Sequence, residues 1–360
     1  MNTSTTEPMV SPSKWQRAAP IITLIFLSPV IADVLFGSIR ITTLFVLILV
    51  TGFWGCAALI IRDVVRRHHQ GWLAILLLGI ALAIAEECVI QQTSLAPLIG
   101  VDPNRAYGRA LGVNWIYLIW ALGYESIWAV VLPIQLTELI FPDRRDIPWL
   151  GKRGLIISTI ILALASFFAW YSWTQILVPQ YFPNLDYQVP LSSVLIALAI
   201  IVVLVAIAFR LPTSSIPEQR RTRLKTPSPW QVGLIAFTLG LPWFGLVLLS
   251  YGAVTTLPLV IPAVVGVILA GSSFFLIEAW ASSPNWQDAH RLGLILGALL
   301  ASMLGGSIIL TVGGALPIDR IGQLVLNLIA IVLLIYLVRR VQLRKNRRHY
   351  MTEKEADSSS

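Results

Sequence analysis

Charged residues are scarce in this sequence of 360 amino acids. Asp, Glu, Lys and Arg make up 12% of the chain and hydrophobic residues 56%, against about 25% and roughly 45 to 50% in an average soluble domain. A soluble core could not bury so much apolar surface. The apolar residues form blocks of roughly 17 to 25, the length that a helix needs to cross a hydrocarbon layer of about 30 Å. The sequence therefore predicts that lipid surrounds most of the chain.

Cysteine and histidine are also scarce. The two cysteines, Cys56 and Cys88, lie inside apolar blocks that place them toward opposite faces of the membrane, which argues against a disulfide between them. The sequence has no Gly-rich phosphate loop, no Ser elbow and no zinc signature. We therefore expect neither a cofactor nor a metal site built on histidine. All four histidines fall in predicted loops or in the tail: His68, His69, His290 and His349.

Ten apolar blocks are long enough to span a membrane. The predicted fold is therefore an all-α, polytopic bundle of about ten transmembrane helices over residues 21–338, preceded by a disordered arm at 1–20 and followed by a basic tail at 339–360. A Pro, Ser and Arg-rich linker, 211–229, separates six helices from four. The fourth block contains Pro133 and should tilt or kink. The blocks are 21–37, 41–61, 72–92, 113–139, 154–175, 191–209, 231–250, 256–279, 292–314 and 321–338.

Basic residues are concentrated on one side of this map. If the N-terminus is cytoplasmic, the cytoplasmic segments hold 22 of the 26 Lys and Arg residues, as the positive-inside rule requires. The outer side keeps only Arg40, Arg105, Arg109 and Arg320. We therefore predict that both termini are cytoplasmic. Tryptophans near the ends of the blocks fit an interfacial belt.

The net charge of +8 could indicate a nucleic-acid partner, because basic patches bind phosphate. Here the basic residues lie in short loops between apolar blocks, which membrane topology explains better. We expect a plasma-membrane protein whose partner is the lipid bilayer and which binds no nucleic acid. The sequence leaves a protein partner and the oligomeric state open.

Four carboxyl groups lie inside predicted spans: Asp33, Glu86, Glu87 and Glu125. An ionisable group there costs roughly 2.5 to 3.5 kcal/mol on insertion scales, so each is a candidate for function. Asp33, Glu86 and Glu125 all map to the outer half of the layer, which makes a shared cavity among the first, third and fourth helices reasonable. In apolar surroundings such groups favour the protonated form, and close groups titrate together. Proton carriage or cation coordination would follow.

Polar neighbours accompany these carboxyls. Adjacent residues on a helix point about 100° apart, so only one of Glu86 and Glu87 is expected to face a given neighbour directly, and Glu87 shares a face with Gln91. On the fourth helix Tyr124 belongs to a polar, aromatic stripe beside Glu125. The other members of the stripe are Tyr117, Trp128 and Gln135.

A structural role for the carboxyls remains an alternative. Each could pair with Arg105 or Arg109, or bond to Tyr, Trp or Gln across helices and lock the packing. Glu138 and Glu278 lie at inner helix ends beside basic loops, where we predict a solvated ion pair.

The Glu86-Glu87 pair resembles the first motif, Glu-Glu-x-x-x-Arg, of the CAAX-protease and bacteriocin-processing family of intramembrane enzymes. That family implies a glutamate that activates water, with histidines completing the site. Here Gln91 stands at the arginine position and no span supplies the histidines, so kinship would imply a lost catalytic set. Residues 27–33, the Glu-Glu helix and residues 148–151 also resemble uncharacterised bacterial multi-pass proteins, which implies the plasma membrane but no activity.

Three function classes stay open from the sequence. The first is a carrier or permease for a small solute or cation that uses the intramembrane carboxylates. The second is a scaffold or accessory subunit of a membrane complex. The third is an intramembrane hydrolase or its inactive relative. The candidate binding residues for the first class are Asp33, Glu86, Glu87, Gln91, Tyr124 and Glu125.

Overall fold

Ten helical stretches of the chain are long and apolar enough to cross a membrane, as predicted. The computed structural model describes residues 13–101, 107–185, 187–211, 225–252 and 256–359, with side chains through Arg344. The ten spans are Lys14–Val34, Ile41–Arg67, Trp72–Ile90, Trp115–Ile140, Lys152–Tyr181, Leu191–Arg210, Pro229–Ser250, Val260–Ala281, Asp288–Val312 and Pro317–Arg344.

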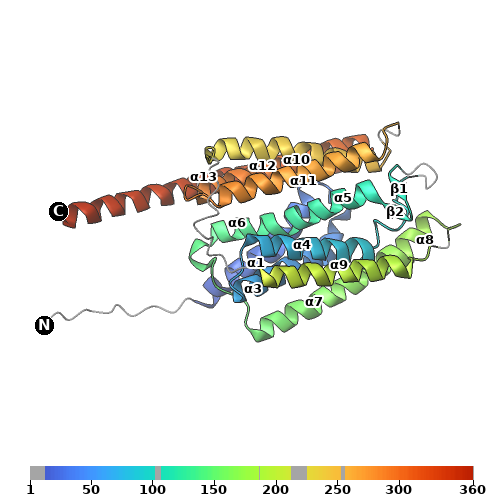
Figure 1. The fold of residues 1–360 in the computed structure, drawn as a ribbon, viewed down its shortest axis with the longest axis horizontal. Coiled ribbons are helices and arrows are strands. Elements are labelled where there is room, and N and C mark those ends of the chain that lie inside the picture. Colours follow the sequence, from blue (N-terminus) through green and yellow to red (C-terminus); the bar gives the residue numbers. More distant parts are fainter. Residues whose placement is uncertain (1–12, 102–106, 186, 212–224, 253–255, 360) are drawn as a thin grey trace.

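The first five spans are each divided into shorter helical elements (Figure 1). The first consists of α1 (Lys14–Pro29) and η1 (Val30–Val34), and the second of η2 (Ile41–Val46), α2 (Leu47–Val50), η3 (Thr51–Gly55) and α3 (Cys56–Arg67). The third is α4 (Trp72–Ala85) and η4 (Glu86–Ile90), and the fourth is α5 (Trp115–Tyr124), η6 (Glu125–Val131) and α6 (Leu132–Ile140). The fifth is α7 (Lys152–Trp170), η8 (Tyr171–Leu177) and α8 (Val178–Tyr181).

Each of the last five spans is a single helix. They are α9 (Leu191–Arg210), α10 (Pro229–Ser250), α11 (Val260–Ala281), α12 (Asp288–Val312) and α13 (Pro317–Ser359). A short hairpin of β1 (Arg109–Ala110) and β2 (Val113–Asn114) precedes the fourth span, and η7 (Pro142–Arg144) follows it.

The two chain ends differ from the predicted arm and tail. A capping box between Ser13 and Gln16 starts α1 at Lys14, so part of the predicted arm is helical. Residues 1–12 and most of the linker, 212–224, lie outside the described residues. At the other end α13 continues through the tail to Ser359 and projects beyond the bundle (Figure 1).

The fourth span occupies the centre of the bundle. It contacts α4 and α1 on one side and α10, α11 and α12 on the other, and in Figure 1 it lies between the blue-green and the yellow-to-red helices. Its residues join the largest apolar core, with Trp120, Trp128 and Leu132 beside Phe244 and Leu299. Most side chains of the central span beyond its first turns are therefore buried.

The outer helices expose apolar side chains instead. Ile160 on α7, Leu195 on α9, Val267 on α11 and Leu328 on α13 are each more than half exposed. Exposed apolar surface that continues along whole helices is the surface expected to contact lipid tails. The arrangement fits a multi-pass membrane protein.

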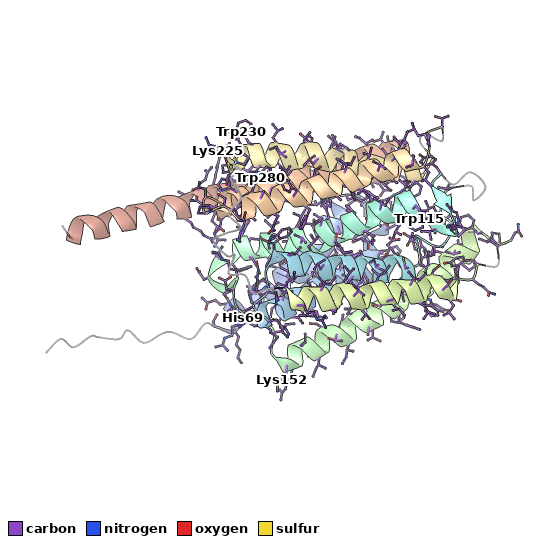
Figure 2. All side chains as sticks on the ribbon, in the orientation of Figure 1. His69, Trp115, Lys152, Lys225, Trp230 and Trp280 are labelled. Atoms are coloured by element: carbon purple, nitrogen blue, oxygen red, sulfur yellow. The ribbon has the colours of Figure 1, made fainter. Side chains whose placement is uncertain are left out.

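The loops that connect successive spans lie at the two ends of the helix bundle. His69, Lys152, Lys225 and Trp280 lie at one end of the bundle, which we call the basic end, and Trp115 lies at the opposite end (Figure 2). The predicted assignment of loops to two sides is consistent with this arrangement.

Five spans contain a π-helical segment, where the backbone bonds run from residue i to i−5. In η4, for example, the Gln91 amide donates to the Glu86 carbonyl at 2.9 Å, and in η1 the Leu35 amide donates to the Val30 carbonyl at 2.9 Å. Such wider turns are rare and are frequently found at functional sites. In the fourth span, which the sequence predicts to tilt or kink, the π-helical segment η6 ends just before Pro133.

Candidate functional site

Three of the predicted carboxyl residues begin π-helical segments. Glu86 and Glu87 are the first two residues of η4, and Glu125 is the first residue of η6. Gly79 allows α4 and η6 to approach, since a Cβ atom at Gly79 would lie 3.2 Å from the carbonyl oxygen of Ser126. The helix break and the close approach together place the third span's acids against the fourth span's acid.

The three glutamates form a compact buried group, which we call the carboxyl cluster (Glu86, Glu87 and Glu125). One oxygen of each lies within 4.8 Å of the others. The side chains are 5%, 1% and 8% exposed. Oε2 of Glu86 and Oε2 of Glu125 are buried without a hydrogen-bond partner, an arrangement that is unfavourable unless a ligand or a proton completes it.

One expectation from the sequence needs correction here. Both Glu86 and Glu87 reach Glu125, although a regular α-helix would allow only one to face it directly. The wider turn of η4 reduces the angle between successive side chains and removes that restriction. The three carboxyls also form a group that could hold a metal ion, whereas the expected absence of a metal site stays a prediction.

No described basic side chain neutralises the carboxyl cluster. The predicted partner Arg109 instead donates to the main-chain oxygens of Leu95 and Ala96 and to Oδ1 of Asn114, at 2.7 to 3.0 Å; Arg105 lies outside the described residues. Three ionised carboxylates this close would repel strongly in an apolar interior. The cluster must therefore hold protons, a cation or both.

Residues 92–98 cover the cluster at the end opposite the basic end, and we call them the cover segment. The Ser94 hydroxyl donates to Oε2 of Glu87 at 2.5 Å. Gln92 adopts a positive φ of 61°, a left-handed conformation that is uncommon outside glycine and turns the chain away from the helix. Residues 92–98 are all buried, so this segment of the predicted external loop, residues 93–112, packs into the bundle.

The hairpin holds the cover segment in place. Nδ2 of Asn114 donates to the carbonyls of Thr93 and Ala96 at 3.2 and 2.7 Å, and its amide donates to the Ser94 carbonyl at 2.8 Å. Burial beneath this segment lowers the pKa of the Arg109 guanidinium. Arg109 and Asn114 thus act on the cluster through the segment, a role that the sequence did not suggest.

Asp33, Gln91 and Tyr124 lie outside the group of three. Asp33, in η1, accepts a hydrogen bond at 2.9 Å from Ser38, and its Oδ2 is buried without a partner. The Gln91 side chain is partly exposed. The Tyr124 hydroxyl donates to the carbonyl of Ala32 and so links the fourth span to the first. The structure therefore brings three of the six candidates together.

The aromatic stripe predicted on the fourth helix is present, and Trp120 belongs to it in addition to Tyr124 and Trp128. The Tyr124 ring stacks on Trp120 at 4.9 Å and on Trp128 at 5.5 Å between ring centroids. Trp128 also donates to the Ala298 carbonyl at 3.1 Å. These contacts occupy the polar atoms of Tyr124 and Trp128, so the stripe fixes the central helix rather than offering free ligand groups.

A second polar cluster, which sequence reasoning missed, lies at the basic end. The guanidinium of Arg62 is fully buried, lies 3.5 Å from the centre of the Trp149 ring, and pairs with Glu138 at 3.2 Å. Arg66 binds the same carboxylate at 2.7 Å. The expected ion pair of Glu138 is confirmed, but the prediction that it is solvated is wrong, because Glu138 is 2% exposed.

Asp63 completes this second cluster. It accepts hydrogen bonds from the amides of Trp149 and Leu150 at 2.7 and 2.9 Å and pairs with Arg67 at 2.7 Å. The spacing of four between Asp63 and Arg67 was a visible signal for that pair. Both acids here have a basic partner, so neither leaves an uncompensated buried charge. The carboxyl cluster differs in having none.

Comparison of the chain with protein-family models, with curated proteins and with solved structures finds no match.

Proposed function

We propose that this chain is a multi-pass membrane carrier that binds a small cation at the carboxyl cluster. The observation that carries this proposal is the gathering of three buried carboxyl groups within 4.8 Å without a basic partner among the described residues. An ionisable group inside a membrane protein usually faces a partner, a cavity or a transport path. A cation supplies the missing charge, and two unpartnered oxygens supply ligand atoms for it.

The proposed carrier resides in the plasma membrane with the basic end in the cytoplasm. The excess of Lys and Arg in the loops of that end supports this orientation. Cysteines placed at Trp115 and Lys152, at opposite ends (Figure 2), report it. In intact cells an impermeant maleimide should label Trp115→Cys but not Lys152→Cys, and the reverse pattern would reject the orientation.

Cation movement into liposomes that contain the purified protein tests the function. We expect proton or metal-ion flux with the unaltered protein and at least tenfold less with Glu86→Gln, Glu87→Gln or Glu125→Gln, because each loses a charged ligand. Glu278→Gln is the matched control, since Glu278 lies on the membrane helix α11 outside the cluster. Normal flux in all three cluster variants, with Glu278→Gln also normal, would reject the carrier.

The alternatives predict other outcomes. A scaffold would co-purify with a partner and tolerate the same glutamine substitutions. An intramembrane hydrolase would need a nucleophile or histidine ligands beside the glutamates, and none of the described histidines joins the group of three acids. A carrier therefore explains the carboxyl cluster without a partner protein, a nucleophile or histidine ligands.

A further inference from the structure

We infer that the carboxyl cluster binds one divalent, oxygen-preferring metal ion. This inference rests on the proposed function, because it names the cargo of the same site. The donor set is all oxygen: three carboxyls and, beside them, the Ser94 hydroxyl that contacts Glu87 at 2.5 Å. Carboxylate and hydroxyl oxygens suit ions such as Ca²⁺, Mn²⁺ and Mg²⁺.

The spacing of the oxygens matches an ion of this class. Two ligands of one ion can lie no farther apart than twice the metal–oxygen distance, which is roughly 4.6 to 5.2 Å for Ca²⁺ and about 4.2 Å for Mg²⁺. The cluster oxygens lie within 4.8 Å of one another. Three oxygens at this limit would lie about 2.8 Å from their common centre, so a Ca²⁺-sized ion is held after a small contraction of the cluster and a smaller ion after a larger one.

Charge favours a divalent ion over a monovalent one. Three ionised carboxylates carry three negative charges, so a monovalent ion leaves two uncompensated in a buried site, whereas a divalent ion leaves one, which a single proton neutralises. The empty cluster is neutral when all three carboxyls are protonated. Binding of the metal then breaks two O–H bonds and releases about two protons to water, and release of the metal reverses this.

We assign the protons that metal binding releases to the three glutamates rather than to the titratable groups around them. Phenols and thiols ordinarily remain protonated at neutral pH, and burial raises the pKa of Tyr251, just after α10, to about 12. The helix α9 presents apolar residues to this region, Ala197, Ile201 and Leu204. Asp33 is the remaining acid nearby, and the Asp33→Asn variant measures its contribution. The titratable neighbours are Asp33, Cys88, Tyr117, Tyr124 and Tyr251.

We place the entrance to the site at the cover segment, because this segment contacts the cluster. Ser94 contacts the cluster directly, and Asn114 anchors the segment with three hydrogen bonds. Loss of the Asn114 side chain removes two of these bonds and loosens the segment. The Asn114→Ala variant should therefore bind and release metal faster than the unaltered protein.

Mn²⁺ binding to the full-length protein in lipid nanodiscs tests the inference. Electron paramagnetic resonance counts bound Mn²⁺, and an indicator dye in weak buffer counts released protons. We expect one saturable Mn²⁺ per chain, competition by Ca²⁺ and release of about two protons at a pH that leaves the empty cluster protonated. The Asp33→Asn and Glu278→Gln variants should retain the site and the proton release.

Substitutions in the cluster separate the outcomes. Glu125→Gln should weaken Mn²⁺ binding at least tenfold, and the double variant Glu86→Gln, Glu125→Gln should abolish it, with size-exclusion profiles like that of the unaltered protein. Absence of saturable binding in both the unaltered protein and Asn114→Ala would overturn the inference. Glutamate-dependent proton flux in liposomes without metal would then still uphold the carrier.

Discussion

Two buried glutamates on the fourth span have opposite surroundings. Glu138 receives the guanidinium groups of Arg62 and Arg66 at 3.2 and 2.7 Å, whereas Glu125 lies beside two further carboxyls. Removing one partner of a buried ion pair is strongly destabilising because the other charge remains buried. Removing one member of a like-charged group relieves repulsion instead.

The two sites should therefore respond oppositely to the same substitution. We expect Glu138→Gln to lower the free energy of unfolding by about 3 kcal/mol, because Arg62 loses its buried counter-charge, and Glu86→Gln to leave stability unchanged or raised. Thermal unfolding of the purified variants in detergent measures the difference. Equal destabilisation by both substitutions would mean that the carboxyl cluster is a packing element rather than a binding site.

The irregular helical segments determine where the acidic side chains of the site lie. The segments η4 and η6 begin at the clustered glutamates, and η1 contains Asp33. Contacts between helices satisfy the backbone groups that such breaks release, as when Ser28 of α1 donates to the Ala129 carbonyl of η6 at 2.6 Å. The breaks are therefore stable features that bring side chains from two spans together.

The contact between α4 and η6 should set the geometry of the cluster. We expect Gly79→Val to separate the two helices, because its Cβ would already lie 3.2 Å from the Ser126 carbonyl oxygen, and to cost roughly 1 to 3 kcal/mol of stability. Mn²⁺ affinity should fall at least tenfold. Gly271→Val is the matched control, since a Cβ at Gly271 of α11 meets open space. Unchanged affinity in Gly79→Val would contradict this account of the contact.

The sequence predicted the spans well because hydrophobicity is local. All ten blocks correspond to helices that are long and apolar enough to cross a membrane, and Glu86, Glu87 and Glu125 could be singled out because charge is rare in such blocks. The π-helical segments left no signal, since they depend on contacts between helices. The buried pair of Arg62 and Glu138 was missed because Arg62 was assigned to a loop, although α3 extends to Arg67.

The two polar clusters of the molecule lie toward opposite ends of the bundle. The cluster at the basic end is fully paired and joins the two groups of helices, since Arg145, in the loop after the fourth span, binds Asp288 of α12 at 2.9 Å. The carboxyl cluster lies against the cover segment, whose carbonyl groups accept hydrogen bonds from the Asn114 side chain. The cluster at the basic end is thus neutralised by ion pairs, whereas the carboxyl cluster has no basic partner among the described residues.

Carbodiimide labelling with and without Mn²⁺ tests most directly that the three glutamates form one accessible cation site, because the reagent modifies protonated carboxyls in apolar surroundings. Mass spectrometry of the purified protein should show labelling within the cluster near neutral pH and its suppression by Mn²⁺, with labelling of Glu278 unaffected by the metal. Labelling of the cluster that is the same in both conditions, or no labelling of any of the three glutamates, would contradict the account.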